Sequence, residues 1–365
     1  MRGMRITVVA LATVAFLLSF AAPAFAAGQA EEDYVAVVSK GEQHDFWQNV
    51  RAGAEDAAEE FGVEMTYEGP PSEEDVQDQV QMLNSALARN PDAIALAALD
   101  TNAVMDNLEE AMARGIPVIG FDSGVPDAPA GSVLANAATN NYEAAGMAAD
   151  HMFEAIRDEI EAASADEPVT IAVLNQDAAG ESLLSRGRGF RDRMVELIES
   201  ETAHGFDDIQ VTGNPAYIAD DSPTDGDAVI INMYVPASAS TTDIASTANT
   251  VFRNVDDDNI VGIFASNEGT VRGVLSATDD GAALGSTFED VVVVGFDAGA
   301  AQKEAVRQGY FLGSITQDPY SIGYEAIRLS VAAIAGEAVE DVDTGAHFWN
   351  ADNMDDEGIA ELLYD

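Results

Sequence analysis

The sequence contains no cysteine and very little positive charge. Its 365 residues include 65 acidic side chains against 16 basic ones, and the only lysines are Lys40 and Lys303. Without cysteine the chain has no disulfide, no thiolate ligand for a metal and no cysteine nucleophile. It also lacks the cysteine that carries an N-terminal lipid, so we expect no membrane anchor on the mature protein. Without a basic face it cannot neutralise phosphates, which excludes nucleic acid as a partner.

The acidic excess gives a formal net charge of −49 at pH 7. Carboxylates at this density keep a protein soluble, but they repel one another and destabilise the compact state at low salt. Molar salt shortens the screening length to ~3 Å and relieves this repulsion. The excess is spread along the whole chain, which indicates adaptation to a salty medium. A site for a cationic ligand, the alternative explanation, needs only a local cluster.

Catalytic signatures are missing as well. The four histidines, His44, His151, His204 and His347, form no H-E-x-x-H pair, and the chain has no G-x-S-x-G or Walker A motif. We therefore expect no enzymatic activity, cofactor or resident metal. The acidic run 219–227 offers the oxygen ligands that calcium prefers, but it lacks the spacing of an EF-hand.

Residues 1–27 have the pattern of a secretory signal peptide. Two arginines precede an apolar run from Ile6 to Ala22, Pro23 interrupts that run, and Ala24-Phe25-Ala26 supplies a small-x-small cleavage pattern. The apolar run is short for a membrane span of ~20 residues. We expect cleavage near Ala26 or Ala27 and a periplasmic location. Loss of the two arginines takes the net charge from −49 to −51.

Strand-like and helix-like segments alternate up to residue 121. Short apolar, β-branched runs predict strands at Tyr34–Ser39, Val63–Tyr67, Ala93–Ala98 and Pro117–Phe121. Apolar residues at helical spacing predict helices at Phe46–Phe61, Glu73–Arg89 and Ala103–Arg114. This order predicts a parallel sheet covered by helices on both faces.

The same pattern starts again near residue 140. It predicts helices at Asn141–Ile160, Leu183–Glu199 and Val271–Ala277, and strands at Val169–Asn175, Ile260–Ala265, Val291–Phe296 and Leu312–Ile315. The fold class is therefore α/β, with two doubly wound, Rossmann-like lobes. Such sheets bind ligands at the carboxyl ends of their strands, and two facing lobes form a cleft there.

One region departs from this alternation. Ile209–Val211 and Val229–Val235 are two candidate strands where a single strand would suffice. An acidic segment, 219–227, joins them. We interpret the region 209–239 as a hairpin-like insertion with an acidic turn.

Polar and aromatic residues recur directly after the predicted strands. His44, Phe46 and Trp47 follow the first strand, and later strands are followed by Asp122, Ser123, Asn267, Asp297 and Gln317. Carboxylates and amides can exchange hydrogen bonds with several hydroxyls while aromatic rings cover a sugar face. Each polar residue alone could instead cap a helix, and the two aromatics could belong to the core. The recurrence of the pattern favours a binding site for a neutral polyol.

Six segments carry a resemblance to a known family. They are VVSKGEQHDFWQNVRAGAEDAAEEFG, RGIPVIGFDSGV, AATNNYEAAGMAADHM, SRGRGFRDRM, GIFASNEGTVRGVL and VVVGFDAGAAQKEAVRQGYFLGSITQDPYSIGYEA. In order and spacing they resemble the type I periplasmic sugar-binding proteins of ABC transporters, specifically the ribose-binding-protein-like group. The resemblance covers nearly all of the mature chain.

The resemblance implies an N-terminal lobe of residues 33–139 plus 318–346 and a C-terminal lobe of residues 140–317 plus 347–365. It also implies a three-strand hinge, with crossings near 138–140, 317–319 and 345–348, about which the lobes close on ligand. The ligand-binding residues that it implies are His44, Phe46, Trp47, Asp122, Ser123, Asn140, Arg186, Asn267, Asp297 and Gln317.

This chain departs from ribose binders at several places. Ser123 stands where they carry an arginine, and Ala97 where they carry an asparagine. Their far-lobe aromatic falls near Ala239, and Tyr217 or Tyr234 are the candidates to replace it. The sequence therefore fits xylose, galactose or arabinose as the ligand as well as it fits ribose.

The resemblance implies a monomeric receptor that captures a pentose or hexose and delivers it to the permease of an ABC importer. A periplasmic signalling or chemotaxis receptor for a small furanose, such as an autoinducer, is the alternative. A related sugar-responsive repressor would need an N-terminal helix-turn-helix, where this chain has a signal peptide pattern.

Overall fold

The computed structural model describes residues 32–42 and 44–364. The predicted signal peptide, 1–27, lies outside the described residues. Within them, the α/β fold with two sheets is confirmed.

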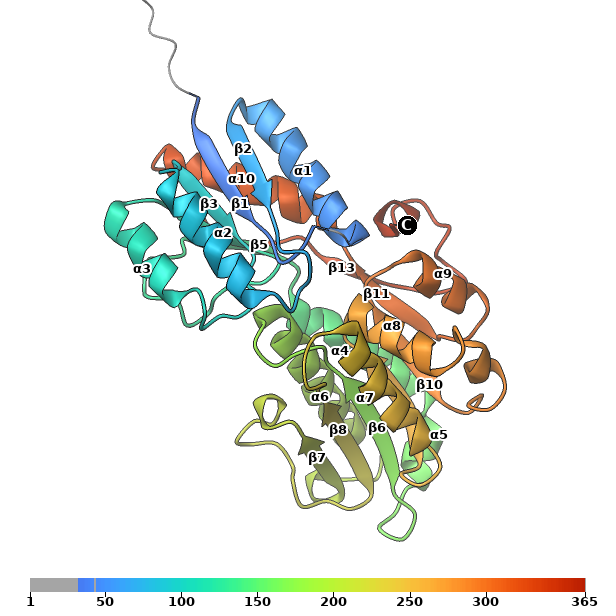
Figure 1. Ribbon diagram of the computed structural model, residues 1–365. Helices are drawn as coiled ribbons and strands as arrows, with labels where there is room; N and C mark the ends of the chain where they lie inside the picture. Colours follow the sequence, from blue (N-terminus) through green and yellow to red (C-terminus); the bar gives the residue numbers. More distant parts are fainter. Residues whose placement is uncertain (1–31, 43, 365) are drawn as a thin grey trace, which may run out of the picture. The chain divides into compact units, whose positions relative to one another are not determined.

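The first sheet has the strand order β12-β5-β4-β3-β1-β2, and every pairing in it is parallel. Its strands are β1 (Tyr34–Val38), β2 (Glu64–Glu68), β3 (Ala93–Leu96), β4 (Val118–Phe121), β5 (Ala135–Ala138) and β12 (Val342–Asp343). The helices packed on it are α1 (Asp45–Phe61), α2 (Val76–Ala88), α3 (Met105–Arg114) and α10 (Pro319–Ile334) (Figure 1).

The period-two alternation of β1 divides the core of this lobe between the two faces of the sheet. Val35 and Val37 belong to the cluster shared with α1 and α10, whereas Ala36 and Val38 belong to the cluster shared with α2 and α3. Both faces are therefore buried, which explains why the central strands are continuous apolar runs rather than alternating ones.

Helices α1 and α10 pack unusually closely because glycines lie at their contact. A Cβ on Gly53 would be 2.0 Å from the carbonyl oxygen of Tyr320, and a Cβ on Gly323 would be 1.8 Å from that of Val50. Any larger residue at either position would push the two helices apart. This contact ties α10, late in the chain, to the beginning of the first lobe.

The second sheet has the order β13-β11-β10-β9-β6-β8-β7. Its strands are β6 (Val169–Leu174), β7 (Ile209–Gly213), β8 (Val229–Tyr234), β9 (Ile260–Ala265), β10 (Val292–Phe296), β11 (Gly313–Gln317) and β13 (Ala346–Trp349). All pairings are parallel except that of β13 with β11. The accompanying helices are α4 (Asn141–Ala155), α5 (Arg157–Ala162), α6 (Glu181–Glu201), α7 (Thr241–Arg253), α8 (Glu268–Ala277) and α9 (Ala300–Arg307).

Two sequence-based expectations in this lobe are wrong. The hairpin-like insertion is absent from the described residues, because β7 and β8 are parallel neighbours and β8 lies between β7 and β6. The connection 214–228 returns to the start of β8, as a parallel pair requires. Part of it runs along the open edge of β7, where the N–H of Val211 donates to the carbonyl oxygen of Pro223 (2.7 Å), and Tyr217 anchors it in the core. The single helix predicted for 141–160 is broken at Ile156, whose backbone (φ −117°, ψ 18°) leaves the helical region.

The chain passes between the two sheets at three places. These passages lie between β5 and α4, between β11 and α10, and between β12 and β13. Two of them are joined by hydrogen bonds: Thr139 Oγ1 donates to the carbonyl oxygen of Gly345 (3.0 Å), and the N–H of Asn140 donates to Asp343 Oδ1 (3.0 Å).

Candidate functional site

A pocket is lined by residues at the carboxyl ends of strands from both sheets. The first lobe contributes Lys40, His44, Phe46, Trp47, Glu73 and Asp122. The second contributes Gln176, Leu183, Arg186, Asn267, Glu268, Gly269, Asp297 and Gln317. This placement follows from the fold, because doubly wound sheets gather their loops at this edge.

Asp122 and Asp297 occupy equivalent positions in the two lobes. Each directly follows a buried strand, β4 or β10, and each has a left-handed backbone, with φ of 53° and 73°. Aspartate tolerates this conformation better than most residues, yet such strain concentrates at functional sites. Both side chains are buried. Each sheet thus presents one desolvated carboxylate to the pocket.

In the first lobe, Asp122 pairs with Lys40. The ammonium Nζ lies 2.9 Å from Asp122 Oδ2 and donates to Ser182 Oγ at 3.2 Å. Burial by itself lowers the pKa of Lys40, but the carboxylates of Asp122 and Glu73 outweigh it and raise that pKa. Lys40 is therefore charged at neutral pH.

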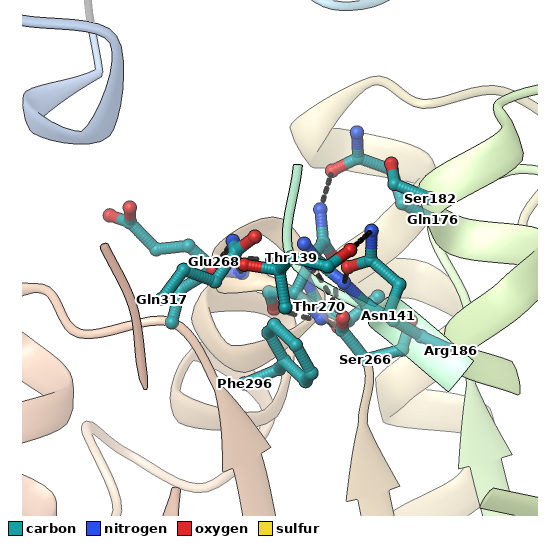
Figure 2. A network of polar contacts seen from close by, with 12 residues as sticks. Thr139, Asn141, Gln176, Ser182, Arg186, Ser266, Glu268, Thr270, Phe296 and Gln317 are labelled. Atoms are coloured by element: carbon teal, nitrogen blue, oxygen red, sulfur yellow. Dashed lines mark hydrogen bonds and ion pairs between the residues drawn. The ribbon is translucent and has the colours of Figure 1, made fainter. Parts of the chain in front are cut away.

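In the second lobe, Asp297 pairs with Arg186. The guanidinium Nη1 lies 3.7 Å from Asp297 Oδ2, and the guanidinium carbon lies 3.8 Å from the centroid of the Phe296 ring. Figure 2 shows Arg186 held from two further sides: Nε donates to Asn141 Oδ1 (2.8 Å) and Nη1 to the carbonyl oxygen of Ser266 (3.2 Å). These contacts fix the orientation of the guanidinium before any ligand arrives.

Asp297 itself is held by two donors. Gln317 Nε2 donates to Oδ1 (2.6 Å) and the N–H of Glu268 donates to Oδ2 (3.0 Å). Burial nevertheless raises the pKa of Asp297, against the opposing charge of Arg186. Gln317 Oε1 is buried and has no hydrogen-bond partner among the described residues, so it is an acceptor available to a ligand.

The adjacent aromatics Phe46 and Trp47 are both buried and both line the pocket. Their rings meet edge to face with centroids 4.9 Å apart. Trp47 Nε1 donates to Glu73 Oε1 at 2.9 Å, which fixes the indole plane. Phe46 and Trp47 therefore pack in the core and line the pocket at the same time.

A chain of side-chain hydrogen bonds crosses the cleft. Gln176 Nε2 donates to Glu73 Oε2 (2.8 Å), and Asn267 Nδ2 donates to Gln176 Oε1 (2.8 Å). A side chain at position 269 would displace this bridge, since a Cβ on Gly269 would be 2.0 Å from Gln176 Oε1, the end of a flexible side chain. Burial tends to raise the pKa of Glu73, but the positive charge of Lys40 overcomes it and the pKa is lowered.

A second contact across the cleft joins His44 and Glu268. His44 Nδ1 lies 3.6 Å from Glu268 Oε2, and Arg272 contacts the other oxygen of that carboxylate. The Glu268 carboxylate raises the pKa of His44 against the effect of burial. This contact therefore strengthens as His44 gains its proton.

Two of the residues implied by the resemblance lie outside the pocket. Ser123 is buried behind it, and its hydroxyl accepts the N–H of Ser182 at 3.3 Å. Asn140 is exposed and caps α4, where its side chain accepts the N–H of Glu143 at 3.3 Å. It is thus a helix cap, the alternative to a ligand-binding role. The other eight line the pocket: His44, Phe46, Trp47, Asp122, Arg186, Asn267, Asp297 and Gln317.

Sequence reasoning missed part of the lining. Lys40 and Gln176 both directly follow predicted strands, and that signal could have found them. Glu73 gave no signal beyond its place at a helix start. Tyr217 and Tyr234, the candidates for a far-lobe aromatic, do not line the pocket: Tyr217 is fully buried and donates to the carbonyl oxygen of Asp177, and Tyr234 packs against the core.

Residues 32–42 and 44–364 contain neither a metal-binding cluster nor a membrane-crossing helix. No group of three or more His, Asp or Glu side chains in these ranges is placed to hold a metal ion. In the same part of the chain, no helix combines the length and apolar character that a membrane crossing needs.

Comparison with known proteins gives consistent results. The family model described as periplasmic binding protein domain matches residues 35–338. The D-allose-binding periplasmic protein of Escherichia coli is 24% identical over 346 residues, covering 92% of this chain and 94% of that protein. The ribose import binding protein of Salmonella typhimurium is 25% identical over 335 residues, covering 90% and 94%.

Solved structures agree in fold. One from Brachyspira murdochii, named as an ABC transporter, LacI family transcriptional regulator, has a TM-score of 0.76 and 37% identity, covering 92% of this chain and 99% of that one. A carbohydrate transporter solute binding protein from Agrobacterium radiobacter, in complex with D-arabinose, has a TM-score of 0.71 and 27% identity, covering 91% and 99%.

Proposed function

This chain belongs to the periplasmic binding protein domain family, and on that premise we propose that it is an exported receptor that captures a neutral monosaccharide and delivers it to an ABC sugar importer. The observation that carries the proposal is the pocket built from both lobes. Its charged side chains are fixed by partners on the protein, and its aromatics lie beside them. Relatives named for D-allose and ribose, and a solved relative holding D-arabinose, support a pentose or hexose.

The charge of the lining supports a neutral ligand. Four carboxylates, from Glu73, Asp122, Glu268 and Asp297, face the cations of Lys40 and Arg186, and the His44 imidazole also lines the pocket. A sugar acid would add a further negative charge to a desolvated site that already holds more acids than bases. Hydroxyl groups, in contrast, can donate to the carboxylates and accept from the ammonium and guanidinium. The absence of a catalytic arrangement in the sequence agrees with a protein that binds and releases its ligand unchanged.

The cellular setting follows from the same proposal. Residues 1–27 direct export and are removed, and the mature monomer works in the periplasm. The lobes of 33–139 plus 318–346 and 140–317 plus 347–365 close about the three crossing segments when the sugar binds. The closed surface is what the permease recognises. We include all ten residues implied by the resemblance as candidate ligand contacts. Ser123 and Asn140 should contribute least to sugar affinity, because they lie outside the pocket.

A thermal-shift screen tests the proposal. The chain lacking residues 1–27, in molar salt, is heated with aldopentoses, aldohexoses, D-tagatose, inositols, D-glucuronate and amino acids. A sugar present at 100 times its dissociation constant stabilises the folded state by about 2.7 kcal/mol. We expect a marked shift with one neutral sugar and none with D-glucuronate. The absence of a shift with every sugar, on protein shown to be folded, would overturn the proposal.

A matched pair of variants localises the binding. Asp122→Asn removes a buried pocket carboxylate, whereas Asp127→Asn makes the same change on the exposed loop five residues later. Hydrogen bonds to charged groups contribute about 1.5–3 kcal/mol, so we expect the first variant to bind the sugar ~10- to 100-fold more weakly and the second to match wild type. Equal affinities would place the sugar elsewhere.

A further inference from the structure

The segment that follows β13, residues 350–364, is bound to the second lobe beside the pocket. Two backbone carbonyl oxygens near its end accept hydrogen bonds from that lobe: Thr316 Oγ1 donates to Leu362 (3.1 Å), and Lys303 Nζ donates to Leu363 (3.4 Å). Several of its apolar side chains belong to the same core cluster as the buried face of α1. The end of the segment therefore lies between the beginning of α1 and α9 (Figure 1).

Tyr364, in this segment, supports the backbone turn that presents Asp297 to the pocket. Its hydroxyl oxygen accepts the N–H of Ala298 at 3.3 Å. Trp349 Nε1 holds the same turn by donating to the carbonyl oxygen of Asp297 at 3.3 Å. The left-handed backbone of Asp297, with φ of 73°, costs free energy and persists only where neighbouring groups hold it. The position of this pocket carboxylate therefore depends on Trp349 and Tyr364.

The ring of Tyr364 also contacts the first lobe. Its centroid lies 6.2 Å from that of Phe46, in the first turn of α1, and the ring planes meet edge to face at 67°. Phe46 lines the pocket, whereas Tyr364 is buried and does not. One side chain outside the pocket thus contacts a pocket aromatic of one lobe and the turn that carries a pocket carboxylate of the other.

The contact between Phe46 and Tyr364 belongs to the closed arrangement of the lobes. The hydrogen bond between Glu73 and Gln176 shows that the two sides of the cleft touch in this structure. Opening moves the first lobe, with Phe46, away from the second lobe, to which Tyr364 is bound. A contact made only in the closed state shifts the population toward that state and opposes opening.

We propose that Tyr364 is a positioning residue for sugar binding, which holds the Asp297 turn and receives the Phe46 ring on closure, so that release of the sugar is slowed. This inference rests on the proposed function and deepens it, because it assigns ligand retention to a residue outside the pocket. The competing explanation is that Tyr364 is an ordinary core residue, whose loss lowers stability alone. The two explanations differ in the rate at which folded protein releases its sugar.

Stopped-flow fluorescence measures this rate. The chain has two tryptophans, Trp47 in the pocket and Trp349 at the Asp297 turn, so its emission is sensitive to events at the site. Wild type, Tyr364→Leu and Tyr364→Phe, each lacking residues 1–27, are mixed in molar salt with the sugar that stabilises wild type most. Tyr364→Leu loses the ring contact and the hydrogen bond, and we expect ~10-fold faster dissociation with an unchanged association rate. Tyr364→Phe keeps the ring and should recover part of this difference, with dissociation ~3-fold faster than wild type.

A double-mutant cycle isolates the ring contact. Phe46→Leu changes the pocket itself and should weaken sugar binding by itself. If the two rings act together, adding Tyr364→Leu to Phe46→Leu should accelerate release by only ~3-fold, less than the ~10-fold effect of Tyr364→Leu in the wild-type background. Equal effects in both backgrounds would overturn the assigned role of the ring.

A control at another tyrosine separates ligand retention from stability. Tyr310 packs against the same core cluster from the second lobe and does not line the pocket. Tyr310→Leu should lower the melting temperature and leave the dissociation rate at the wild-type value.

The outcomes distinguish the two proposals. If Tyr364→Leu lowers the melting temperature but releases the sugar at the wild-type rate, Tyr364 is only a core residue and the inference is overturned. If Tyr364→Leu does not fold, Tyr364→Phe decides in the same way, by faster release or by the wild-type rate. If wild type binds no sugar in the thermal-shift screen, the proposed function fails and the inference fails with it.

Discussion

Replacing Arg186 with methionine should destabilise the protein severely and make its stability depend on pH. The methionine keeps an unbranched apolar stem but removes the guanidinium. That group contacts Asn141, Ser266 and Asp297 and lies over the Phe296 ring. The variant therefore leaves Asp297 as a buried carboxylate without its cation.

The magnitude follows from this geometry. Removing one partner of a buried ion pair costs about 3–5 kcal/mol, because the other charge stays desolvated. At about 2–4 °C per kcal/mol for units of ~150–250 residues, the melting temperature should fall by roughly 10 °C. Arg188→Met is the matched control, since Arg188 lies two residues later on α6 and is exposed. Its cost should stay below about 1 kcal/mol.

The pH dependence has a defined sign. Burial already raises the folded-state pKa of Asp297, and loss of Arg186 removes a charge that opposes this rise. Below the unfolded-state pKa the carboxyl is neutral in both states and carries no penalty. As pH rises through the folded-state pKa, the buried group must ionise and stability is lost. The deficit of Arg186→Met relative to wild type should therefore be largest near neutral pH and shrink on acidification.

Urea unfolding of both variants at several pH values, in molar salt, measures these effects. Asp297→Asn added to Arg186→Met should recover part of the lost stability by removing the unpaired charge. The reasoning is refuted if Arg186→Met is as mild as Arg188→Met, or if its deficit is the same at every pH.

Three other predictions concern salt, protonation and the bridge across the cleft. The net charge of −49 predicts that the melting temperature falls when molar salt is removed; an unchanged value would rule out self-repulsion as a major term. The His44–Glu268 contact, which raises the pKa of His44, predicts stability that is present below about pH 6.5 and lost as pH rises through the folded-state pKa. His44→Gln should flatten this part of the melting-temperature profile, and a profile like that of wild type would count against the contact. Gly269→Ala should displace the flexible end of Gln176, lowering sugar affinity by ~10-fold with little change in melting temperature; full affinity by calorimetry would show that the bridge is not needed.

Periodicity was a reliable guide to most of the fold because the physical signal is local. Apolar runs of four to six residues became the buried strands β3, β6 and β9, and glycine ended α1 where Gly62 adopts a left-handed backbone. The direction of β8 relative to β7 is not a local property. It depends on where the intervening segment packs, and the burial of Tyr217 in the core could not be read from an acidic, proline-containing run.

The site was predictable where it depends on strand ends and unpredictable where it depends on the approach of distant segments. Asp122 and Asp297 directly follow strands, so the fold class alone brings them to one edge. The hydrogen bond between Glu73 and Gln176 joins residues 103 positions apart, and no sequence pattern predicts it. Asn140 has the same chemistry as Asn267, and only the three-dimensional structure separates an exposed helix cap from a cap that also reaches the pocket.

A crystal structure of the chain lacking residues 1–27, grown with the sugar that stabilises it most, tests the central claim directly. We expect electron density for one sugar between Trp47 and Arg186, with hydroxyls within hydrogen-bond distance of Lys40, Asp122 and Asp297. Density for the sugar outside this pocket, or an empty pocket in crystals grown at saturating sugar, would contradict it.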